Sequence, residues 1–422
     1  MLDDDFVKLA SYVSVDNEIP ARMMFYSIMG AYHDNIKIAF GAKNKDVRLS
    51  LIWLQGSRSG KGQLLKVGQD TSTGLGLRHV TNTDFSTAGL IGSPNQTKLD
   101  FNIKYNLSPE NPISATGRYH YQIPFDSGDI KDNDIIFFPE AKKAFARRSY
   151  SEDLLTDLQP TLDYPGYVRK KLKSAAIEYQ CSPTYILTTY NYTGLTNAIT
   201  EQGFFQRGQF YMRTLSAEDI KRMREMQDSL LGHNTQITYD KLLAELITKI
   251  KRIDNTKPIL LTVSKAAIAM KKKLMLMFIN RIENEISGDK FGIAMSFSQT
   301  IDDIILKTAA MRCVWRQGTQ IESYDIVPTT MNFNNWVYLQ MAKSIIEGLS
   351  LDDNHLKLLT RRALSVFVKL SKRVNKSTFQ KILISEMALS YDKSRALINK
   401  LLEQNLLRTV AGDKNTKYLT KT

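Results

Sequence analysis

The sequence predicts an α/β domain with a mostly parallel sheet and helices on both faces, followed by a small helical unit. Three observations support this fold class. Short apolar runs that suit buried strands alternate with helical stretches between residues 46 and 215. A glycine-containing loop follows the first apolar run, and a segment that can start a helix follows the loop. Residues 341–422 read as three helices and a hairpin.

The chain has an ordinary globular composition but a strongly basic charge balance. Of its 422 residues, 43% are apolar and 24% are charged, and the formal net charge is +14. The excess favours polyanionic partners, above all nucleic acid, although a generic basic protein carries the same charge. Two separated cysteines argue against a structural zinc site. We expect no signal peptide, no membrane span and a cytoplasmic location, in a host if a virus or plasmid encodes the chain.

Four segments follow one another along the chain. The first reads as helical, with Pro20 expected to separate two helices, and the third as a mainly helical extension of the core. Within the core, the expected buried strands are at residues 48–55, 134–138 and 184–190, and residues 80–91 hold a strand followed by small residues. We therefore expect an N-terminal helical segment (1–45), an α/β core (46–215), a helical extension (216–340) and a C-terminal unit (341–422).

The loop after the first strand is similar to a Walker A phosphate loop, G-x-x-x-x-G-K-[ST]. In that motif backbone N–H groups hold phosphates, the lysine reaches the terminal phosphates and the hydroxyl binds Mg²⁺. Gln55 stands where the first glycine is expected, and Gly62 stands where the hydroxyl is expected. The alternative is a glycine turn with an exposed lysine. The candidate nucleotide-binding residues are Gly56, Ser57, Arg58, Ser59, Gly60, Lys61, Gly62 and Gln63.

The second buried strand ends at a carboxylate. Residues 135–140 read IIFFPE, so Glu140 follows the strand and can orient or deprotonate an attacking water. Pro139 stands where an aspartate usually helps to hold Mg²⁺, and the candidates to replace the altered metal contacts are Ser59, Asp134 and Glu140. The alternative for Glu140 is a carboxylate at a helix N-terminus, which the helix dipole favours.

Two further polar residues follow apolar segments of the core. Asn191 ends the third strand, where its amide can hold a water beside the γ-phosphate. Arg207 follows a short apolar turn, from which an arginine can enter a neighbouring subunit's site and stabilise phosphoryl charge. The alternative for Arg207 is an ordinary surface arginine.

Taken in order, these segments resemble the minichromosome maintenance helicases, which are hexameric AAA+ ATPases. The resemblance covers residues 48–213 and includes residues 60–66 (GKGQLLK), 85–90 (FSTAGL), 135–140 (IIFFPE), 186–191 (ILTTYN) and 203–207 (GFFQR). It implies a homo-hexameric ring that uses ATP and Mg²⁺ to move along DNA. It also implies that Lys61 binds phosphate, Glu140 is catalytic, Asn191 is sensor 1, and Arg207 is an arginine finger given in trans.

The resemblance also places a DNA-binding hairpin before the sensor strand. Its basic residues are Arg169, Lys170, Lys171 and Lys173, beside Tyr167, which suit contacts to single-stranded DNA in the pore. The alternative is a solvated charged turn. The family's sensor 2 arginine is replaced by Gln299, for which Arg312 or Lys307 are candidate substitutes. The plan is closest to compact helicase-like replication proteins of viruses, plasmids and mobile elements.

The C-terminal unit carries most of the excess charge and resembles a winged helix. Residues 351–422 hold 15 Lys and Arg against 6 Asp and Glu. The third helix is the expected recognition helix, with Lys393 and Arg395 near duplex DNA, and Lys414 lies in the expected hairpin. The alternative is a module that docks protein.

Two hypotheses of different classes follow. The first is an enzyme, an ATP-dependent DNA helicase or translocase that acts in replication initiation or unwinding. The second is a DNA-binding initiator or scaffold whose AAA+ fold binds ATP but hydrolyses it poorly, which the altered metal positions at Gly62 and Pro139 motivate. Glu140 and Arg207 favour the enzyme, because a protein that no longer hydrolyses ATP does not need a catalytic carboxylate or an arginine finger.

Overall fold

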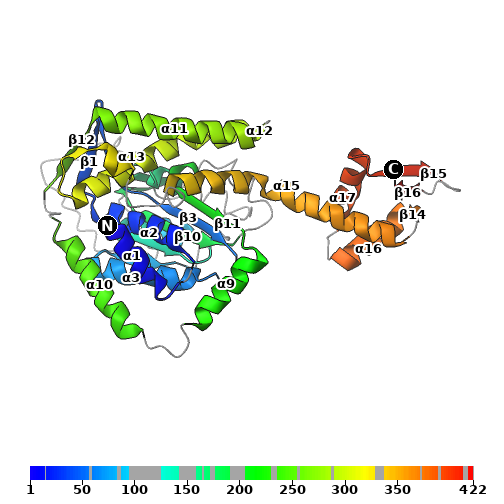
Figure 1. Ribbon diagram of the computed structural model, residues 1–422, viewed down its shortest axis with the longest axis horizontal. Coiled ribbons are helices and arrows are strands. Elements are labelled where there is room, and N and C mark those ends of the chain that lie inside the picture. The colour runs from blue at the N-terminus through cyan, green and yellow to red at the C-terminus, as the bar shows by residue number, and fades with distance from the viewer. Residues whose placement is uncertain are drawn as a thin grey trace, which may run out of the picture. The chain divides into compact units, whose positions relative to one another are not determined.

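The computed structural model divides the chain into two compact units, Met1–Leu349 and Ser350–Thr422. Figure 1 labels the helices and strands of the two units. The structure describes residues 1–14, 16–56, 59–82, 87–94, 125–141, 158–163, 166–171, 176–190, 205–229, 235–253, 257–286, 289–327, 337–370, 373–387, 391–411 and 417–421.

The first unit is built on a five-stranded parallel sheet. Its strands are β3 (Leu51–Gln55), β4 (His79–Thr81), β7 (Ile135–Phe138), β10 (Thr184–Thr189) and β11 (Gln209–Arg213), in the spatial order β11-β3-β10-β7-β4. Every neighbouring pair is parallel. All residues of β3, β7 and β10 are buried, as expected of parallel strands covered on both faces. The α/β class and the three predicted apolar strands are confirmed.

Two N-terminal helices, α1 (Leu2–Ser11) and α2 (Glu18–Tyr32), lie on one side of this sheet: α2 packs against it, and α1 packs against α2. The contacts of α2 are with β3, β10 and α3 (Lys61–Leu75). Aromatic stacking joins the two helices, with ring centroids 5.0 Å apart for Phe6 in α1 and Phe25 in α2. The sequence predicted that Pro20 separates the two helices, and this prediction is wrong. Pro20 lies in the first turn of α2, where a missing N–H has no helical partner to lose. The first helix ends at Ser11 and the second begins at Glu18.

A second sheet corrects the helical prediction for the end of segment 1–45. Residues 36–46 form the hairpin β1 (Ile36–Phe40) and β2 (Lys43–Asp46). β1 pairs in parallel with β12 (Ile259–Val263), which pairs with β13 (Gln320–Ile321), so the extension at 216–340 also contributes strands. The hairpin forms because Ile36 and Ile38 alternate with more exposed residues and bury one face against a distant part of the chain.

Helices dominate the rest of the extension. They are α9 (Ala217–Asp228), α10 (Gln236–Lys251), α11 (Lys265–Glu285), α12 (Asp289–Ser296), α13 (Ser298–Trp315) and α14 (Ser323–Ile326). The start of α15 (Val337–Leu370) lies along β11, the edge strand of the parallel sheet. The Ser344 hydroxyl accepts a hydrogen bond from Met212 N at 2.9 Å and contacts Met212 O at 3.3 Å. This pairing gives the open sheet edge a partner.

Two antiparallel pairs lie between the core strands. The first joins β5 (Gly92–Pro94) to β6 (Phe125–Ser127), between the short helices α4 (Thr87–Ile91) and α5 (Asp129–Asp132). The second joins β8 (Gly166–Lys171) to β9 (Ala176–Cys181), directly before β10. The Tyr179 hydroxyl of β9 donates to the carbonyl of Ile91, the residue before β5, at 2.9 Å, so the second pair contacts the start of the first.

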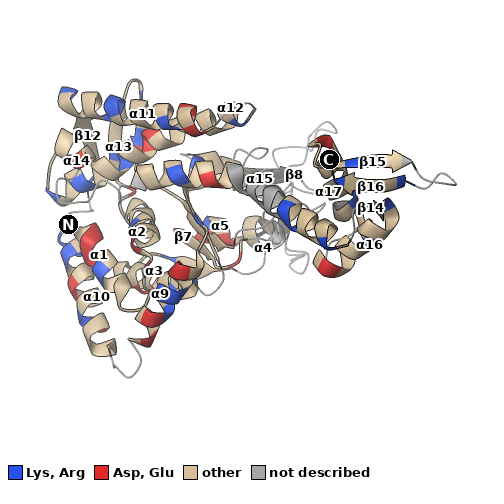
Figure 2. Ribbon diagram, turned by 45° about the vertical axis from the view of Figure 1, so that its right-hand side comes forward, with Lys and Arg blue, Asp and Glu red and all other residues tan. Residues whose placement is uncertain are grey.

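The C-terminal unit holds three helices and a three-stranded antiparallel sheet. The end of α15 is followed by β14 (Arg373–Asn375), α16 (Lys376–Met387), α17 (Tyr391–Glu403), β15 (Leu407–Ala411) and β16 (Lys417–Lys421), with the sheet order β14-β16-β15. Phe367, Phe379 and Leu401 lie in its buried core. Asn375 caps α16 by accepting from Ser377 N at 2.9 Å. Figure 2 marks the Lys and Arg of this unit in blue.

Among the helices that the structure describes, none is long and apolar enough to cross a membrane.

Candidate nucleotide-binding site

The sheet order brings the ends of β3, β10 and β7 together at one edge. Because the strands are parallel, the loop after β3 and the turn after β7 meet at this carboxyl edge, on either side of the end of β10. After β3 the chain runs to β4, which lies beyond β10 and β7 in the sheet order. After β10 it runs to β11, which lies on the opposite side of β3 in that order, so β3 ends at a topological switch point. Ligands of open α/β sheets bind in the crevice at such points. Asn191 would follow β10 there, but it lies outside the described residues.

The predicted phosphate loop leads directly into α3. Gly60 is the N-cap of this helix and has a φ of 79°, a left-handed conformation that glycine adopts without strain. The first N–H groups of α3 have no partner within the helix, so this end favours an anion. Ser59 is buried and Gly62 and Gln63 are exposed. Ser57 and Arg58 lie outside the described residues.

The Lys61 ammonium turns back onto its own loop. It donates to Gln55 O at 2.6 Å, to Gly56 O at 2.7 Å and to Ser59 Oγ at 3.3 Å. Burial of the ammonium lowers its pKa to about 8. A half-buried cation without a carboxylate among these contacts is suited to bind an added anion.

Gln55 is a functional candidate that the sequence analysis noted only as a departure from the motif. Its side chain is fully buried, accepts from Trp53 Nε1 at 2.8 Å, and donates to Asn17 Oδ1 at 3.2 Å. The sequence signal was a polar amide ending a fully apolar strand, where burial requires a partner. The partner Asn17, in the link between α1 and α2, had no signal in the local sequence.

The structure separates one of the three candidate metal contacts, Asp134, from the other two. Glu140 is exposed just after β7, at the same edge as Ser59, and the Thr188 hydroxyl supports its turn by donating to Pro139 O at 2.9 Å. Asp134 precedes β7 and is paired with Arg78 at 2.8 Å, at the opposite end of the strand. Asp134 is therefore wrong as a substitute, because a whole strand separates it from the loop. Within the described ranges no cluster of three His, Cys, Asp or Glu is placed to hold a metal ion.

Arg207 lies at the other end of the sheet from Lys61. It ends a 3-10 turn, η2 (Phe205–Arg207), two residues before Gln209, which pairs with the first residue of β3. Its guanidinium contacts Asp163 at 3.3 Å, and about one third of the side chain is exposed. Since β3 spans five residues, Arg207 and Lys61 are separated by roughly 15 Å of strand.

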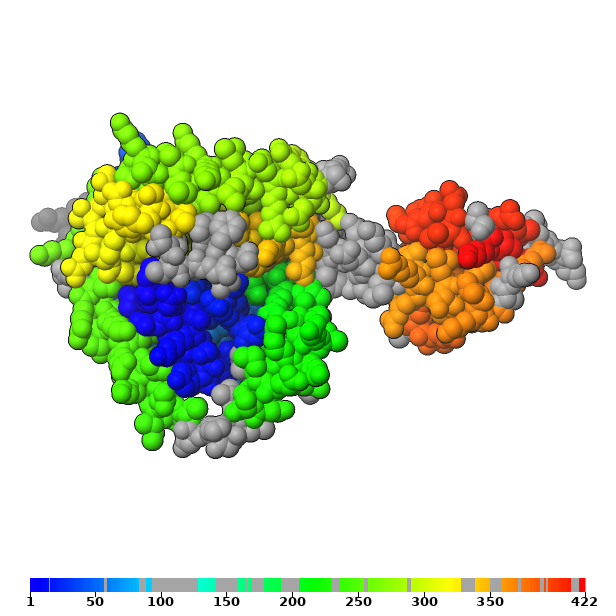
Figure 3. All heavy atoms as spheres, viewed as in Figure 1, coloured from blue at the N-terminus to red at the C-terminus, as the bar shows by residue number. Residues whose placement is uncertain are grey.

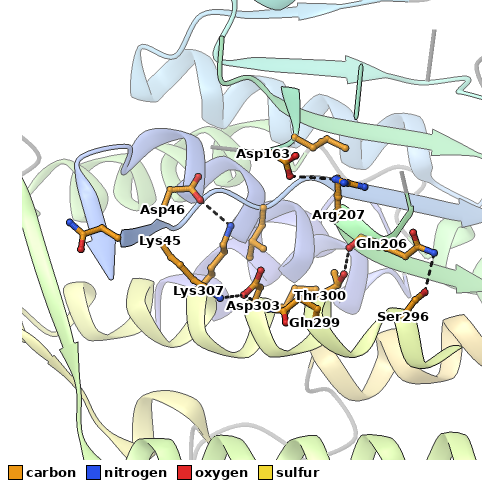
Figure 4. Close-up of a pocket in the computed structure, with 15 residues that line it drawn as sticks. Lys45, Asp46, Asp163, Gln206, Arg207, Ser296, Gln299, Thr300, Asp303 and Lys307 are labelled. Carbon is orange, nitrogen blue, oxygen red and sulfur yellow. Dashed lines mark hydrogen bonds and ion pairs between the residues drawn. The ribbon is translucent and has the colours of Figure 1, made fainter. Parts of the chain in front are cut away.

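A polar pocket of about 380 Å³ surrounds Arg207 (Figure 4). Gln299, which stands at the expected sensor 2 position, and Lys307, a candidate substitute, line the same pocket. Lys307 donates to Asp46 at 3.1 Å and to Arg48 O at 2.8 Å. Arg312 lies elsewhere: it is buried, donates to Asp325 O at 3.0 Å and stacks on Tyr26. Arg312 therefore has a structural role in the core, and the prediction that it could replace the sensor 2 arginine is wrong.

A larger cavity of about 770 Å³ lies beside the first turns of α3. Gly62 and Gln63 line it, together with Tyr12 from the α1–α2 link, Gln227 near the end of α9 and Tyr239 in α10. Figure 3 shows α1 and α2 in blue between α10 and α9 on this face of the molecule. Its size is in the range of small-molecule sites.

The basic residues predicted to contact DNA fall in two places. Arg169, Lys170 and Lys171 end β8, in register with residues 176–178 of β9. Lys393 and Arg395 lie in the first turns of α17, where Arg395 is exposed. Lys173 and Lys414 lie outside the described residues.

No protein-family model matches the chain, and no curated protein matches its sequence.

Proposed function

We propose that the chain is an AAA+ ATPase that uses ATP and Mg²⁺ to move along or unwind DNA, as a homo-hexameric ring, in replication initiation. The observation that carries the proposal is the meeting of the loop around Lys61 and of Glu140 at one sheet edge, across the strand that leads to Asn191. Phosphates lie on the loop, and the rest of the nucleotide extends toward the cavity beside Gly62.

The position of Arg207 supports a site shared between subunits. A side chain that precedes β11 cannot reach the loop that follows β3 in the same chain. It can reach the phosphates of a neighbour when the amino edge of one subunit faces the carboxyl edge of the next. Gln299 and Lys307, in the same pocket, then face the same nucleotide.

Two basic elements support DNA as the partner. The β8–β9 pair carries three cations at the end of one strand, just before the sensor strand, and suits the phosphates of a single strand in a pore. The order of helices and strands in the C-terminal unit, with a hairpin after α17, suits a winged helix that reads duplex DNA.

One observation favours a second candidate, an initiator or scaffold that binds ATP and hydrolyses it poorly. Gly62 and Pro139 lack metal-binding side chains, and Asp134 is at the wrong end of β7. Strand displacement of a forked DNA by the wild-type protein, beside Glu140→Gln, separates the two. The motor displaces the strand with ATP and the variant does not. ATP and DNA binding without displacement in either protein would support the initiator.

Lys61 makes a pH dependence of ATP binding an expected result. Bound phosphate stabilises the ammonium and raises its pKa above the value of about 8 in the free protein. Above pH 8, binding must therefore take up a proton, and affinity falls by up to about tenfold per pH unit. Below pH 8 Lys61 is charged in both states and adds no slope. Isothermal titration calorimetry with ATP from pH 7 to 9.5 measures this dependence of affinity on pH. Lys61→Arg stays protonated and should lose the slope; equal slopes in both proteins would contradict the assignment.

Gly62 allows a test of the altered metal contact. A Cβ added at this position meets no atom within 4 Å, so side chains fit. Gly62→Ala and Gly62→Ser should each raise the free energy of unfolding by about 0.5–1 kcal/mol through helix propensity. Only the serine supplies the hydroxyl of the Walker A pattern. It should lower the Mg²⁺ concentration for half-maximal ATP binding, measured with fluorescent ATP, whereas identical Mg²⁺ curves for both variants would refute the role of this position.

A further inference from the structure

The link between α1 and α2 holds the backbone of the phosphate loop. Asn17 is 3% exposed, and its Nδ2 donates to Ser59 O at 2.7 Å and to Ser14 Oγ at 2.8 Å. The Ser14 hydroxyl in turn donates to Gly60 O at 3.1 Å. Two successive carbonyls of the loop are therefore bound by side chains more than forty residues away in sequence.

These two bonds help to fix the direction of the N–H groups that a phosphate needs. In a planar trans peptide the N–H points opposite to the carbonyl. Turning Ser59 O toward Asn17 points Gly60 N–H to the far side. Gly60 O is held by Ser14 and also by Leu64 N, which donates to it at 3.0 Å as the first bond of α3, so Lys61 N–H is directed in the same way. Successive N–H groups that point to one side form an anion-binding concavity. The link thus presets the loop before any phosphate arrives.

The chemistry of the link requires a carboxamide at this position. Asn17 donates through Nδ2 to Ser59 O and accepts through Oδ1 from Gln55 Nε2 at 3.2 Å. A carboxylate lacks the donor, and an alanine leaves the Ser59 carbonyl and the Gln55 amide without these buried partners. The approach is close, since a Cβ on Gly60 would lie 2.8 Å from Ser14 Oγ and 3.1 Å from Asn17 Nδ2.

The link is also anchored on its other side. Asp16 has a φ of 59° and pairs with Arg213 at 2.9 Å and with Arg222 at 2.7 Å. Both arginines also contact Asp219, in the first turn of α9. The link is therefore held from two directions. Arg213 of β11 and Arg222 of α9 bind Asp16, and Ser14 and Asn17 bind the phosphate loop.

We infer that Asn17 is a positioning residue of the nucleotide site, which with Ser14 directs the Gly60 and Lys61 N–H groups toward the phosphates. This inference rests on the proposed function. Gln55, which stands where the motif has its first glycine, is part of the same hydrogen-bond network, because its amide donates to Asn17 Oδ1 and so orients the Asn17 carboxamide. Nucleotide phosphates, and not the base, are the groups whose binding depends on Asn17.

The test compares Asn17→Ala with wild type by titration of ATP and of adenosine, which lacks the phosphates. ATP affinity should fall roughly 10- to 100-fold, because the buried hydrogen bonds that fix the loop are lost. Adenosine affinity should be unchanged, which a general loss of structure would not produce. Asn35→Ala is the matched control: Asn35 Nδ2 also donates to a backbone carbonyl, Lys257 O at 2.7 Å, away from the loop. It should keep wild-type affinity for ATP.

Asn17→Asp, which keeps the shape but loses the donor, should weaken ATP binding at least as much as Asn17→Ala. If Asn17→Ala does not fold, Ser14→Ala removes the hydroxyl bond to Gly60 O and the bond that Ser14 Oγ accepts from Asn17. It leaves the Asn17 bond to Ser59 O in place, so it should lower ATP affinity by a smaller factor. Wild-type ATP affinity in a folded Asn17→Ala, or in Ser14→Ala, would overturn the inference and leave the proposed function standing. A wild-type protein that binds no ATP would overturn both.

Discussion

Replacing Lys61 with alanine is expected to weaken ATP binding by about two orders of magnitude. The lysine is the cation of the loop, and each charge-assisted hydrogen bond to a phosphate contributes roughly 1.5–3 kcal/mol. Its present acceptors are carbonyls and a hydroxyl of its own loop, which a phosphate can replace without breaking an ion pair. Equilibrium titration with fluorescent ATP measures the change, and circular dichroism checks that the variant is folded.

Lys221→Ala is the matched control for this experiment. Lys221 lies on α9, its side chain is 78% exposed, and it pairs with Glu225 at 3.8 Å. Its removal takes away one positive charge without touching the loop or the cavity beside Gly62, so ATP affinity should change little. Equal losses in the two variants would mean that general charge, and not the position of Lys61, governs binding.

The second large effect is expected at Arg207. Arg207→Ala should lower ATP turnover by about 10³-fold or more, the range found for arginine fingers, while ATP binding stays near the wild-type level. Binding is retained because Arg207 lies at the amino edge of its own sheet, away from its own Lys61. Steady-state phosphate release and nucleotide titration on the same preparation separate the two quantities. Arg281→Ala, which removes an arginine paired with Glu285 on α11, is the control and should keep full turnover.

Mixing the Lys61→Ala and Arg207→Ala proteins tests whether the site is shared. Each variant is inactive alone, but a mixed ring contains interfaces where an intact Lys61 faces an intact Arg207. Turnover should therefore reappear on mixing. A mixture as inactive as its components, with the subunits shown to exchange, would contradict the trans arrangement.

The parts of the fold that the sequence predicted depend on local patterns. The segments at 134–138 and 184–190 are short and rich in apolar and β-branched residues, and each contains a buried parallel strand. The loop between a strand and a helix was predicted for the same reason: β3 ends at Gln55, Gly60 caps the following helix, and Lys61 begins it.

The parts that were missed depend on distant partners. β1 is a strand because β12, more than two hundred residues away, lies beside it, and no window of sequence contains both. Asn17 reaches the loop only because α2, which it precedes, packs on β3 and α3. Asp134 and Glu140 are six residues apart in sequence, yet the strand between them puts them at opposite edges of the sheet. Arg312 has the charge of a sensor but is buried against Tyr26.

The most direct test of the account is Mg²⁺-dependent ATP turnover by the purified wild-type chain, with and without single-stranded DNA, beside Lys61→Ala. The account predicts turnover that DNA stimulates and that the variant lacks. ATP binding without turnover under any DNA condition, or turnover that Lys61→Ala retains, would contradict the claim that the carboxyl edge of this sheet is the active site of a DNA motor.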